Sequence, residues 1–174
     1  YLVGQAGKLG NSFFKNHDEL GINFRKNVII LNKTPIHSAK TNHLKKFASF
    51  GGKEIEDLIK ETQIWMAQET AKLHQNLLKV SENKDFPQLW LVGYSELKEK
   101  GIFTDYKNEL KKQYQTSEES KNAWNNVFVY QHFSMNRFSI DLKEFSTENK
   151  NLDLKTQLKT LGKKHKDEMI EGMK

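Results

Sequence analysis

The clearest hydrophobic pattern in the chain lies between residues 53 and 80. Apolar residues recur there at intervals of three and four, which is the one-sided stripe of an amphipathic helix: Ile55, Leu58, Ile59, Trp65, Met66, Leu73, Leu77 and Val80. The charged residues between them place acids early and bases late, an order that complements the helix dipole. The pattern therefore predicts a helix from Lys53 to Val80, roughly 42 Å long at about 1.5 Å per residue.

A second apolar stripe runs through residues 124–145. Its spacing is close to a heptad rhythm, with Gln131 as its one polar member. Ser117, followed by Glu118 and Glu119, is a typical helix start, and no Gly or Pro follows until Gly162. The two stripes together predict an all-α fold in which long amphipathic helices form an extended antiparallel pair.

The sequence between the two stripes predicts shorter elements. A polar loop is expected over residues 81–85, and Pro87 suits the first turn of a helix that carries Leu89, Trp90 and Leu97 and ends at Gly101. Thr104 is then a candidate cap for a third helix. That helix would present three large side chains on one face: Tyr106, Leu110 and Tyr114.

The two ends of the chain have weaker patterns. Residues 1–50 are interrupted by four glycines and are predicted to form an irregular arm, with a brief strand or an extended segment at Val28–Leu31. A short helix over residues 38–47 would turn Leu44 and Phe47 inward. Gly51 and Gly52 mark a boundary. Three segments result: the arm (1–50), a helical region (51–148) and a polar, peripheral helical tail (149–174).

Composition and charge narrow the class of protein. Apolar residues make up 36% and aromatic residues 11% of the chain, and the mean hydropathy is −0.77. Such values fit either partial disorder or long helices that bury their stripes against other subunits, and the aromatic content argues against wholesale disorder. The net charge is +6, and the excess lies in residues 1–50, which hold eight Lys or Arg and two Asp or Glu. A basic arm of this kind suits nucleic acid, anionic lipid or an acidic protein neighbour.

No motif in the sequence indicates catalysis or a bound cofactor. The chain has no cysteine, which excludes disulfides and thiolate chemistry. The six histidines fall in separate predicted elements without the helical i, i+4 pairing of a zinc site. The Gly4–Gly7 and Gly51–Gly52 segments lack the spacing of a phosphate loop and are interpreted as turns. No apolar run approaches the roughly 18–20 residues that span a bilayer.

Two other readings of the aromatic and basic residues remain open. A basic RNA-associated or organellar ribosomal protein is one alternative, and it rests on the basic arm at residues 1–50. Phe128, Tyr130 and Phe133 beside Arg137 could also stack RNA bases. Tyr130, His132 and Arg137 would belong to the site of a small helical enzyme assembled from distant residues. An aromatic stripe at helical spacing is more often a packing surface, so we expect neither nucleic acid nor a substrate here.

The stretch from Gly52 to Tyr114 resembles subunit d of the mitochondrial F-type ATP synthase. That family has a helix carrying a Trp and a helix ending in leucines, followed by Glu-Asn, a loop and another Trp. A Gly with two apolar residues and an Asp-aromatic pair come next. Ala123-Trp124 is similar to the start of the family's next long helix. The corresponding residues here, with Gly101 eleven positions after Trp90, are Trp65, Leu77-Leu78, Glu82-Asn83, Trp90, Gly101-Ile102-Phe103 and Asp105-Tyr106-Lys107.

The resemblance implies a non-catalytic role in the peripheral stalk on the matrix side of the inner mitochondrial membrane. Subunit d packs along subunit b with subunit h, near the oligomycin-sensitivity-conferring subunit, and the stalk holds the catalytic head against rotor torque. The implied partners are those subunits, in a membrane-associated complex, with no cofactor and no transmembrane helix in this chain. The expected packing anchors are Trp65, Trp90, Tyr106, Trp124 and Phe128. The first fifty residues and the polar tail have no counterpart in the family pattern.

Overall fold

The structure is a computed structural model that describes residues 4–38, 40–81 and 86–171, with side chains as far as Met169. It is 66% helix, which confirms the predicted all-α class, and its one small sheet has two parallel strands among the described residues. In chain order the helices are α1 (Gly4–Asn16), α2 (Thr41–Phe50), α3 (Gly52–Val80), α4 (Thr104–Gln113), α5 (Glu118–Trp124), α6 (Arg137–Glu148) and α7 (Leu154–Glu171). The strands are β1 (Leu89–Val92) and β2 (Val127–Tyr130), and short 3-10 helices cover Asp18–Leu20, Tyr94–Glu96 and Ser134–Asn136.

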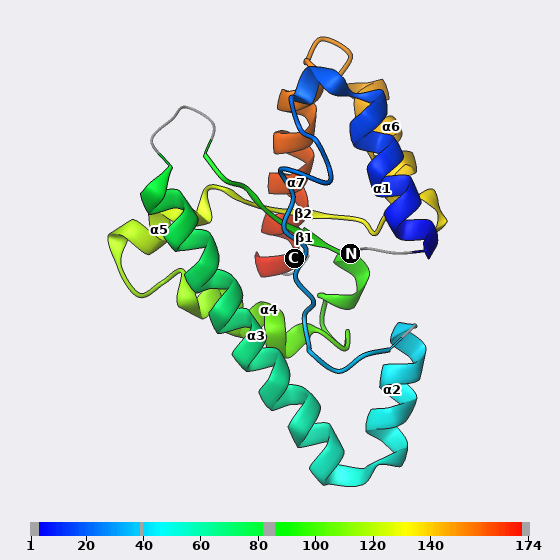
Figure 1. Cartoon of the computed structure of the whole chain (residues 1–174), viewed down its shortest axis with the longest axis vertical. Coiled ribbons are helices and arrows are strands. Elements are labelled where there is room, and N and C mark those ends of the chain that lie inside the picture. The colour runs from blue at the N-terminus through cyan, green and yellow to red at the C-terminus, as the bar shows by residue number, and fades with distance from the viewer. Residues whose placement is uncertain (1–3, 39, 82–85, 172–174) are drawn as a thin grey trace. The chain divides into compact units, whose positions relative to one another are not determined.

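The chain divides into two compact units that do not coincide with the predicted segments. Unit 1 contains Tyr1–Ile30, Trp90–Tyr94 and Val127–Lys174, and unit 2 contains Leu31–Leu89 and Ser95–Asn126. In Figure 1, helices α1, α6 and α7 belong to unit 1, together with β2 and most of β1. Helices α2 to α5 belong to unit 2. Each unit therefore joins parts of the chain that are far apart in sequence.

Unit 1 is built around β2, which is buried along its whole length. Helix α7 packs on this strand, and Gly162 makes the approach possible, because a Cβ there would lie 2.7 Å from Phe128 Cβ. Leu158 and Leu161 of α7 are 3% and 2% exposed and belong to the aromatic core of the unit. The expectation of a peripheral tail is therefore wrong for residues 154–169. The side chain of Ile170 lies outside the described residues.

The predicted long helix over residues 124–145 is also wrong. Val127-Phe128-Val129-Tyr130 forms a strand, as β-branched and aromatic residues favour, and β1 pairs with it. Gly93 N donates to Tyr130 O at 2.9 Å, and Leu89 N donates to Asn126 O at the same distance. Beyond the strand, Met135 and Asn136 have positive φ values of 54° and 56°, which no continuous helix contains. Helix α6 begins only at Arg137.

Several local predictions were corrected in the same way. The helix expected to end at Gly101 is replaced by β1 and a 3-10 turn. Thr104 does not cap α4, because Phe103 occupies the N-cap position and makes no side-chain cap hydrogen bond. Helix α1 occupies residues 4–16 of the supposedly irregular arm, and Val28–Leu31 forms no strand. The polar loop expected at 81–85 lies outside the described residues from position 82 onward.

Unit 2 consists of α3 with α2 and α4 packed along it. The predicted helix at 53–80 is confirmed, at 29 residues from Gly52. Tyr106, Leu110 and Tyr114 are buried on one face of α4, as expected, with 3%, 0% and 1% exposure. Ser117 also caps α5 as its position predicts, because its hydroxyl accepts a hydrogen bond from Ser120 N at 3.1 Å.

Candidate functional site

The buried face of α3 consists largely of small and polar residues. Its buried positions are Ile59, Gln63, Ala67, Thr70, Ala71 and His74, and only Ile59 belongs to the hydrophobic stripe seen in the sequence. A helix normally turns its largest apolar side chains toward the core. In this unit the inward face instead allows close approach of α4 and makes hydrogen bonds with it.

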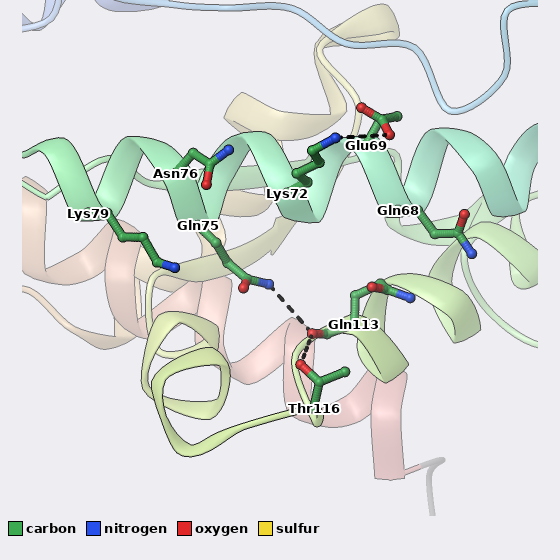
Figure 2. Close-up of a pocket in the computed structure, with 8 residues that line it drawn as sticks. All are labelled: Gln68, Glu69, Lys72, Gln75, Asn76, Lys79, Gln113 and Thr116. Carbon is green, nitrogen blue, oxygen red and sulfur yellow. Dashed lines mark hydrogen bonds and ion pairs between the residues drawn. The ribbon is translucent and has the colours of Figure 1, made fainter.

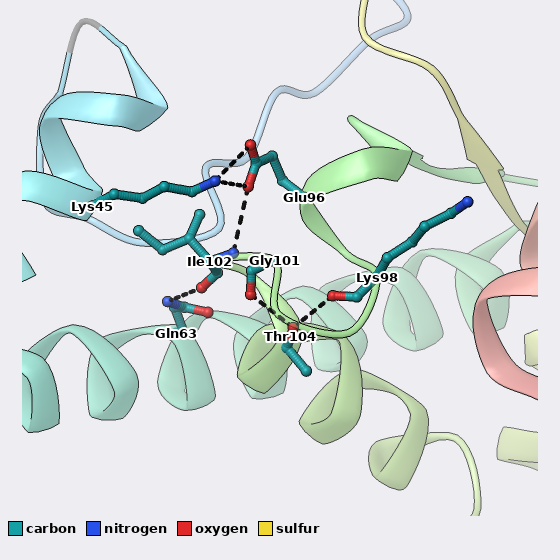
Figure 3. A network of polar contacts seen from close by, with 7 residues as sticks. All are labelled: Lys45, Gln63, Glu96, Lys98, Gly101, Ile102 and Thr104. Carbon is teal, nitrogen blue, oxygen red and sulfur yellow. Dashed lines mark hydrogen bonds and ion pairs between the residues drawn. The ribbon is translucent and has the colours of Figure 1, made fainter. Parts of the chain in front are cut away.

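Hydrogen bonds along α3 show how α4 is held. Gln63 Nε2 donates to Ile102 O at 2.8 Å (Figure 3). Gln63 Oε1 accepts from Tyr106 N at 3.3 Å. Further along, Nδ1 of His74 is 2.6 Å from the Tyr114 hydroxyl. Residue numbers rise together on the two helices, so α4 runs in the same direction as α3. Helix α4 is therefore a short parallel neighbour of α3. The second long helix over residues 124–145, with which α3 was predicted to form an antiparallel pair, does not form.

A turn before α4 fixes the start of that helix. A Cβ on Gly101 would lie 2.3 Å from the carbonyl oxygen of Glu96, so no side chain fits there. The Thr104 hydroxyl donates to the carbonyls of Lys98 and Gly101 at 2.8 and 2.7 Å. Lys45 of α2 forms an ion pair with Glu96 at 2.9 Å, as Figure 3 shows. Gly101 is thus required for close backbone packing and does not cap a preceding helix.

The large apolar side chains of α3 form an exposed row, which we call the α3 row. Leu58, Trp65 and Val80 are 47%, 53% and 73% exposed. Half-buried members lie beside them at helical intervals: Ile55, Met66 and Leu73. A spacing of seven residues separates position 58 from 65, and likewise 66 from 73 and 73 from 80. Seven residues is the heptad repeat by which helices pack in a coiled coil. The row therefore has the composition and the spacing of a surface that packs against another helix.

Charged residues accompany the α3 row in a defined order. Glu54 and Glu61 are exposed in the first half of the helix, and Lys72 and Lys79 are exposed in the second half. Both pairs are separated by seven residues, so each keeps the same position relative to the row. The exposed charge thus shifts from net acidic to net basic along the helix, and Glu69 and Glu119 lie 3.9 and 3.6 Å from Lys72 and Lys79.

A polar groove of about 430 Å³ lies between α3 and the segment after α4 (Figure 2). Gln75 crosses it, donating to Gln113 O at 3.5 Å and accepting from the Ser120 hydroxyl at 3.1 Å. The Thr116 hydroxyl donates to Gln113 O at 3.2 Å. These amides and the hydroxyl are engaged in holding α4 and α5 to α3, which makes the groove a polar border of the α3 row.

The five expected packing anchors occupy different environments. Tyr106 and Phe128 are buried, at 3% and 2% exposure, and Trp65 projects from the α3 row. Trp124 is half-buried, with its ring centroid 5.1 Å from that of Tyr114, and Trp90 is half-buried in unit 1 with its ring 4.5 Å from that of Tyr130. Four of the five thus contribute to packing inside a unit. Of the five, only Trp65 leaves most of its side chain exposed.

The aromatic residues considered for RNA stacking are inaccessible. Phe128, Tyr130 and Phe133 are 2%, 0% and 5% exposed, and the Tyr130 hydroxyl donates to Leu158 O at 2.9 Å. Arg137 is exposed at the start of α6. His132 makes its own contact, with Nδ1 2.6 Å from the Ser134 hydroxyl. The rings therefore offer no stacking face to bases, and Tyr130 and His132 are engaged in separate local hydrogen bonds.

Unit 1 contains one buried polar cluster that the sequence did not reveal. The His165 ring stacks on Tyr94 with centroids 4.6 Å apart, and Nε2 lies 3.6 Å from Asp141 Oδ1. The Tyr94 hydroxyl donates to Glu168 Oε2 at 2.6 Å. Burial raises the pKa of Asp141, and Glu144 and Glu168 act in the same direction against His165 and Lys164. These residues come from three distant segments, so no local pattern could have predicted the cluster.

Metal sites and membrane spans were sought in residues 4–38, 40–81 and 86–171. There, no three His, Cys, Asp or Glu side chains come close enough to hold a metal ion. The same residues contain no helix with the length and apolar character required to cross a bilayer.

The Glu82-Asn83 part of the subunit d pattern lies outside the described residues. Comparisons with protein-family models, with curated proteins and with solved structures yield no match to this chain.

Proposed function

We propose that this protein is a non-catalytic helical scaffold that binds a partner helix along the α3 row. The observation that carries the proposal is the orientation of α3, which buries Gln63, Thr70 and His74 and leaves Leu58 and Trp65 exposed. We further propose that the complex is the peripheral stalk of a mitochondrial ATP synthase, with this chain in the position of subunit d. Its partners would then be b-like, h-like and oligomycin-sensitivity-conferring subunits on the matrix side of the inner membrane.

The exposed row supports a stable protein contact. Burying large apolar side chains against a partner removes them from water. This stabilises the complex by about 25 cal/mol per Å² of apolar surface buried. A tryptophan at the centre of such a row is a frequent binding hot spot. Trp65 occupies the middle of α3, with Leu58 one heptad before it. A long partner helix would bury this row along most of its length.

The order of charges defines the direction of that partner. Most helices carry acids near the start and bases near the end, because this order complements the dipole. A partner of this ordinary kind places its bases against Glu54 and Glu61 only if it runs antiparallel to α3. Its acids would then face Lys72 and Lys79. We therefore propose an antiparallel partner helix.

The stalk assignment is supported by the resemblance to subunit d, which is strongest between Trp90 and Lys107. In that stretch Gly101 has no room for a side chain and Tyr106 is buried. Gly101 and Tyr106, two residues of the pattern, thus each have a packing role in this fold. A stator subunit also requires long helices that resist bending, and α3 has 29 residues.

The test is to express the tagged chain in its source cells, purify it under mild detergent and identify the proteins that accompany it. We expect ATP synthase stalk subunits, and the absence of every ATP synthase subunit would contradict the stalk assignment. The variant Leu58→Ser/Trp65→Ser should lose the partner, whereas Ile140→Ser, which changes an equally exposed residue of α6, should retain it. A double Ser variant that still captures the same partner would overturn the role of the α3 row.

Charge reversal tests the direction of the partner helix. Glu61→Lys should weaken capture, and Lys72→Glu should do the same, because each puts like charges opposite one another across the contact. Cysteines introduced singly into this cysteine-free chain, at Glu54 and at Lys79, would then allow cross-links to be mapped on the partner. Cross-links in parallel order would exclude the antiparallel arrangement.

A further inference from the structure

A second group of exposed apolar side chains lies at the end of α2. Phe50 is 86% exposed and Phe47 is 50% exposed, although the sequence pattern predicted Phe47 to face inward. Leu44 is the buried side chain of α2, at 3% exposure. The chain then turns into α3 through Gly51 and Gly52, the latter with a φ of +72° (Figure 1). All six residues from 49 to 54 are exposed, so Phe50 stands on a convex corner.

Basic residues surround the two phenylalanines. Lys46 precedes Phe50 by four residues and His43 precedes Phe47 by four, so all four side chains lie on one face of α2, and all are exposed. No acid occurs between Leu20 and Lys53, a stretch with six Lys or Arg residues. Two acids close to α2 are already paired: Glu96 forms an ion pair with Lys45, and Asp57 forms one with Lys53. The face of α2 that carries the phenylalanines is thus apolar and basic, and the exposed acid Glu54 follows beyond the turn, in the first turn of α3.

We propose that this corner binds the surface of a membrane that contains anionic phospholipid. Phe47 and Phe50 would insert at the boundary between headgroups and acyl chains, and Lys46 would contact lipid phosphates. A short helix with a basic edge and exposed phenylalanines has the character of an interfacial membrane-binding helix. This surface is separate from the α3 row, and the proposal does not depend on the proposed stalk function.

A lipid surface explains the shape of the corner better than a protein partner does. A stable protein contact buries about 800 Å² on each side, usually with a well-packed centre. Two aromatic rings on a convex turn offer far less area, and a protein would need a pocket for each of them. A bilayer deforms around a convex tip and accepts both rings at once. The attraction between cations and anionic headgroups adds to the insertion and is worth most close to the surface.

The experiment is flotation of the purified full chain with vesicles of two compositions. One is phosphatidylcholine alone, and the other contains roughly three parts phosphatidylcholine to one part phosphatidylglycerol. We expect binding to the anionic vesicles, weaker binding at high salt because the charges are screened, and little binding to the neutral ones. Phe47→Ala/Phe50→Ala should reduce the bound fraction at least about tenfold. Lys46→Glu should reduce it about fivefold or more.

Matched variants separate the corner from other surfaces. Lys159→Glu changes the net charge equally at an exposed position of α7, and Leu58→Ser/Trp65→Ser removes the α3 row, so both should bind vesicles like the wild type. Circular dichroism should show the wild-type helix content in every variant, since all the altered side chains are exposed. Equal binding to both vesicle types, or undiminished binding by the double Ala variant, would overturn the proposal. So would self-association through the phenylalanines without vesicle binding.

Discussion

The imidazole of His74 is held between two partners in the interior of unit 2, with Nδ1 2.6 Å from the hydroxyl of Tyr114. Its Nε2 lies 3.1 Å from the carbonyl oxygen of Pro87, which can only accept a hydrogen bond. Nε2 therefore carries the proton, and Nδ1 accepts from the Tyr114 hydroxyl. The neutral ring satisfies both partners and joins α3 to the end of α4 and to the segment before β1.

This arrangement makes stability depend on pH. Burial lowers the pKa of His74 below its ordinary value of 6.5, with the Pro87 carbonyl acting weakly in the opposite direction. Between the lowered folded pKa and 6.5 the unfolded chain binds more protons, so stability is complete above about pH 6.5 and declines as the pH falls. The decline reaches at most about 1.4 kcal/mol per pH unit. Thermal unfolding followed by circular dichroism from pH 8 to pH 5 would measure it.

Two variants test whether His74 causes the loss of stability at lower pH. His74→Gln should flatten the pH dependence while lowering stability at pH 8, because the amide does not reproduce both hydrogen bonds. His43→Gln changes an exposed histidine and should keep the wild-type pH dependence. An unchanged slope in His74→Gln would show that another group is responsible.

The turn before α4 should not tolerate a side chain at position 101. Gly101→Ala places a methyl group 2.3 Å from Glu96 O and 2.9 Å from Lys98 O, so the backbone must move. We expect a loss of about 1–3 kcal/mol in the free energy of unfolding, measured by urea denaturation. Gly52→Asn is the control, because that position has a φ of +72°, which Asn tolerates, and no atom within 4 Å of its Cβ position. Equal stability of Gly101→Ala and the wild type would contradict the close packing of this turn.

The contact between α7 and β2 should be equally sensitive at Gly162. A Cβ there would lie 2.7 Å from the Phe128 Cβ and from the Tyr130 hydroxyl oxygen, both of which are buried. Gly162→Ala is therefore expected to destabilise unit 1 by about 1–3 kcal/mol and to increase hydrogen exchange in β2. Gly10→Ala should be milder, because its nearest neighbour is the far end of the Phe24 ring at 3.3 Å. The reverse order of the two variants would refute the described packing of α7.

Three of the residues expected as packing anchors should separate into two classes. Tyr106→Ala and Phe128→Ala remove buried rings and should each cost about 3–5 kcal/mol in stability. Trp65→Ala should cost under about 1 kcal/mol in the isolated chain, because more than half of the side chain is already exposed. Chemical denaturation of the three variants would check this. A large loss for Trp65→Ala would mean that its ring stabilises the isolated chain and would weaken the case for the α3 row.

The sequence by itself determined the features that depend on local periodicity. The helix at residues 52–80 follows from the spacing of apolar residues and from the absence of Gly and Pro between residues 53 and 80. The buried face of α4 and the Ser117 cap follow from relations between residues three or four positions apart. Such relations act along one stretch of backbone, so they remain visible in a linear sequence.

The tertiary structure alone decided which faces turn inward and where the second stripe becomes a strand. Val127–Tyr130 is a strand because β1 supplies its hydrogen-bond partners from almost forty residues earlier and α7 covers it from more than thirty residues later. Helix α3 buries Gln63 and His74 because Ile102, Tyr106 and Tyr114 present matching polar groups to them. Those partners are distant in sequence, and the resulting exposure of Trp65 is what indicates a partner-binding surface.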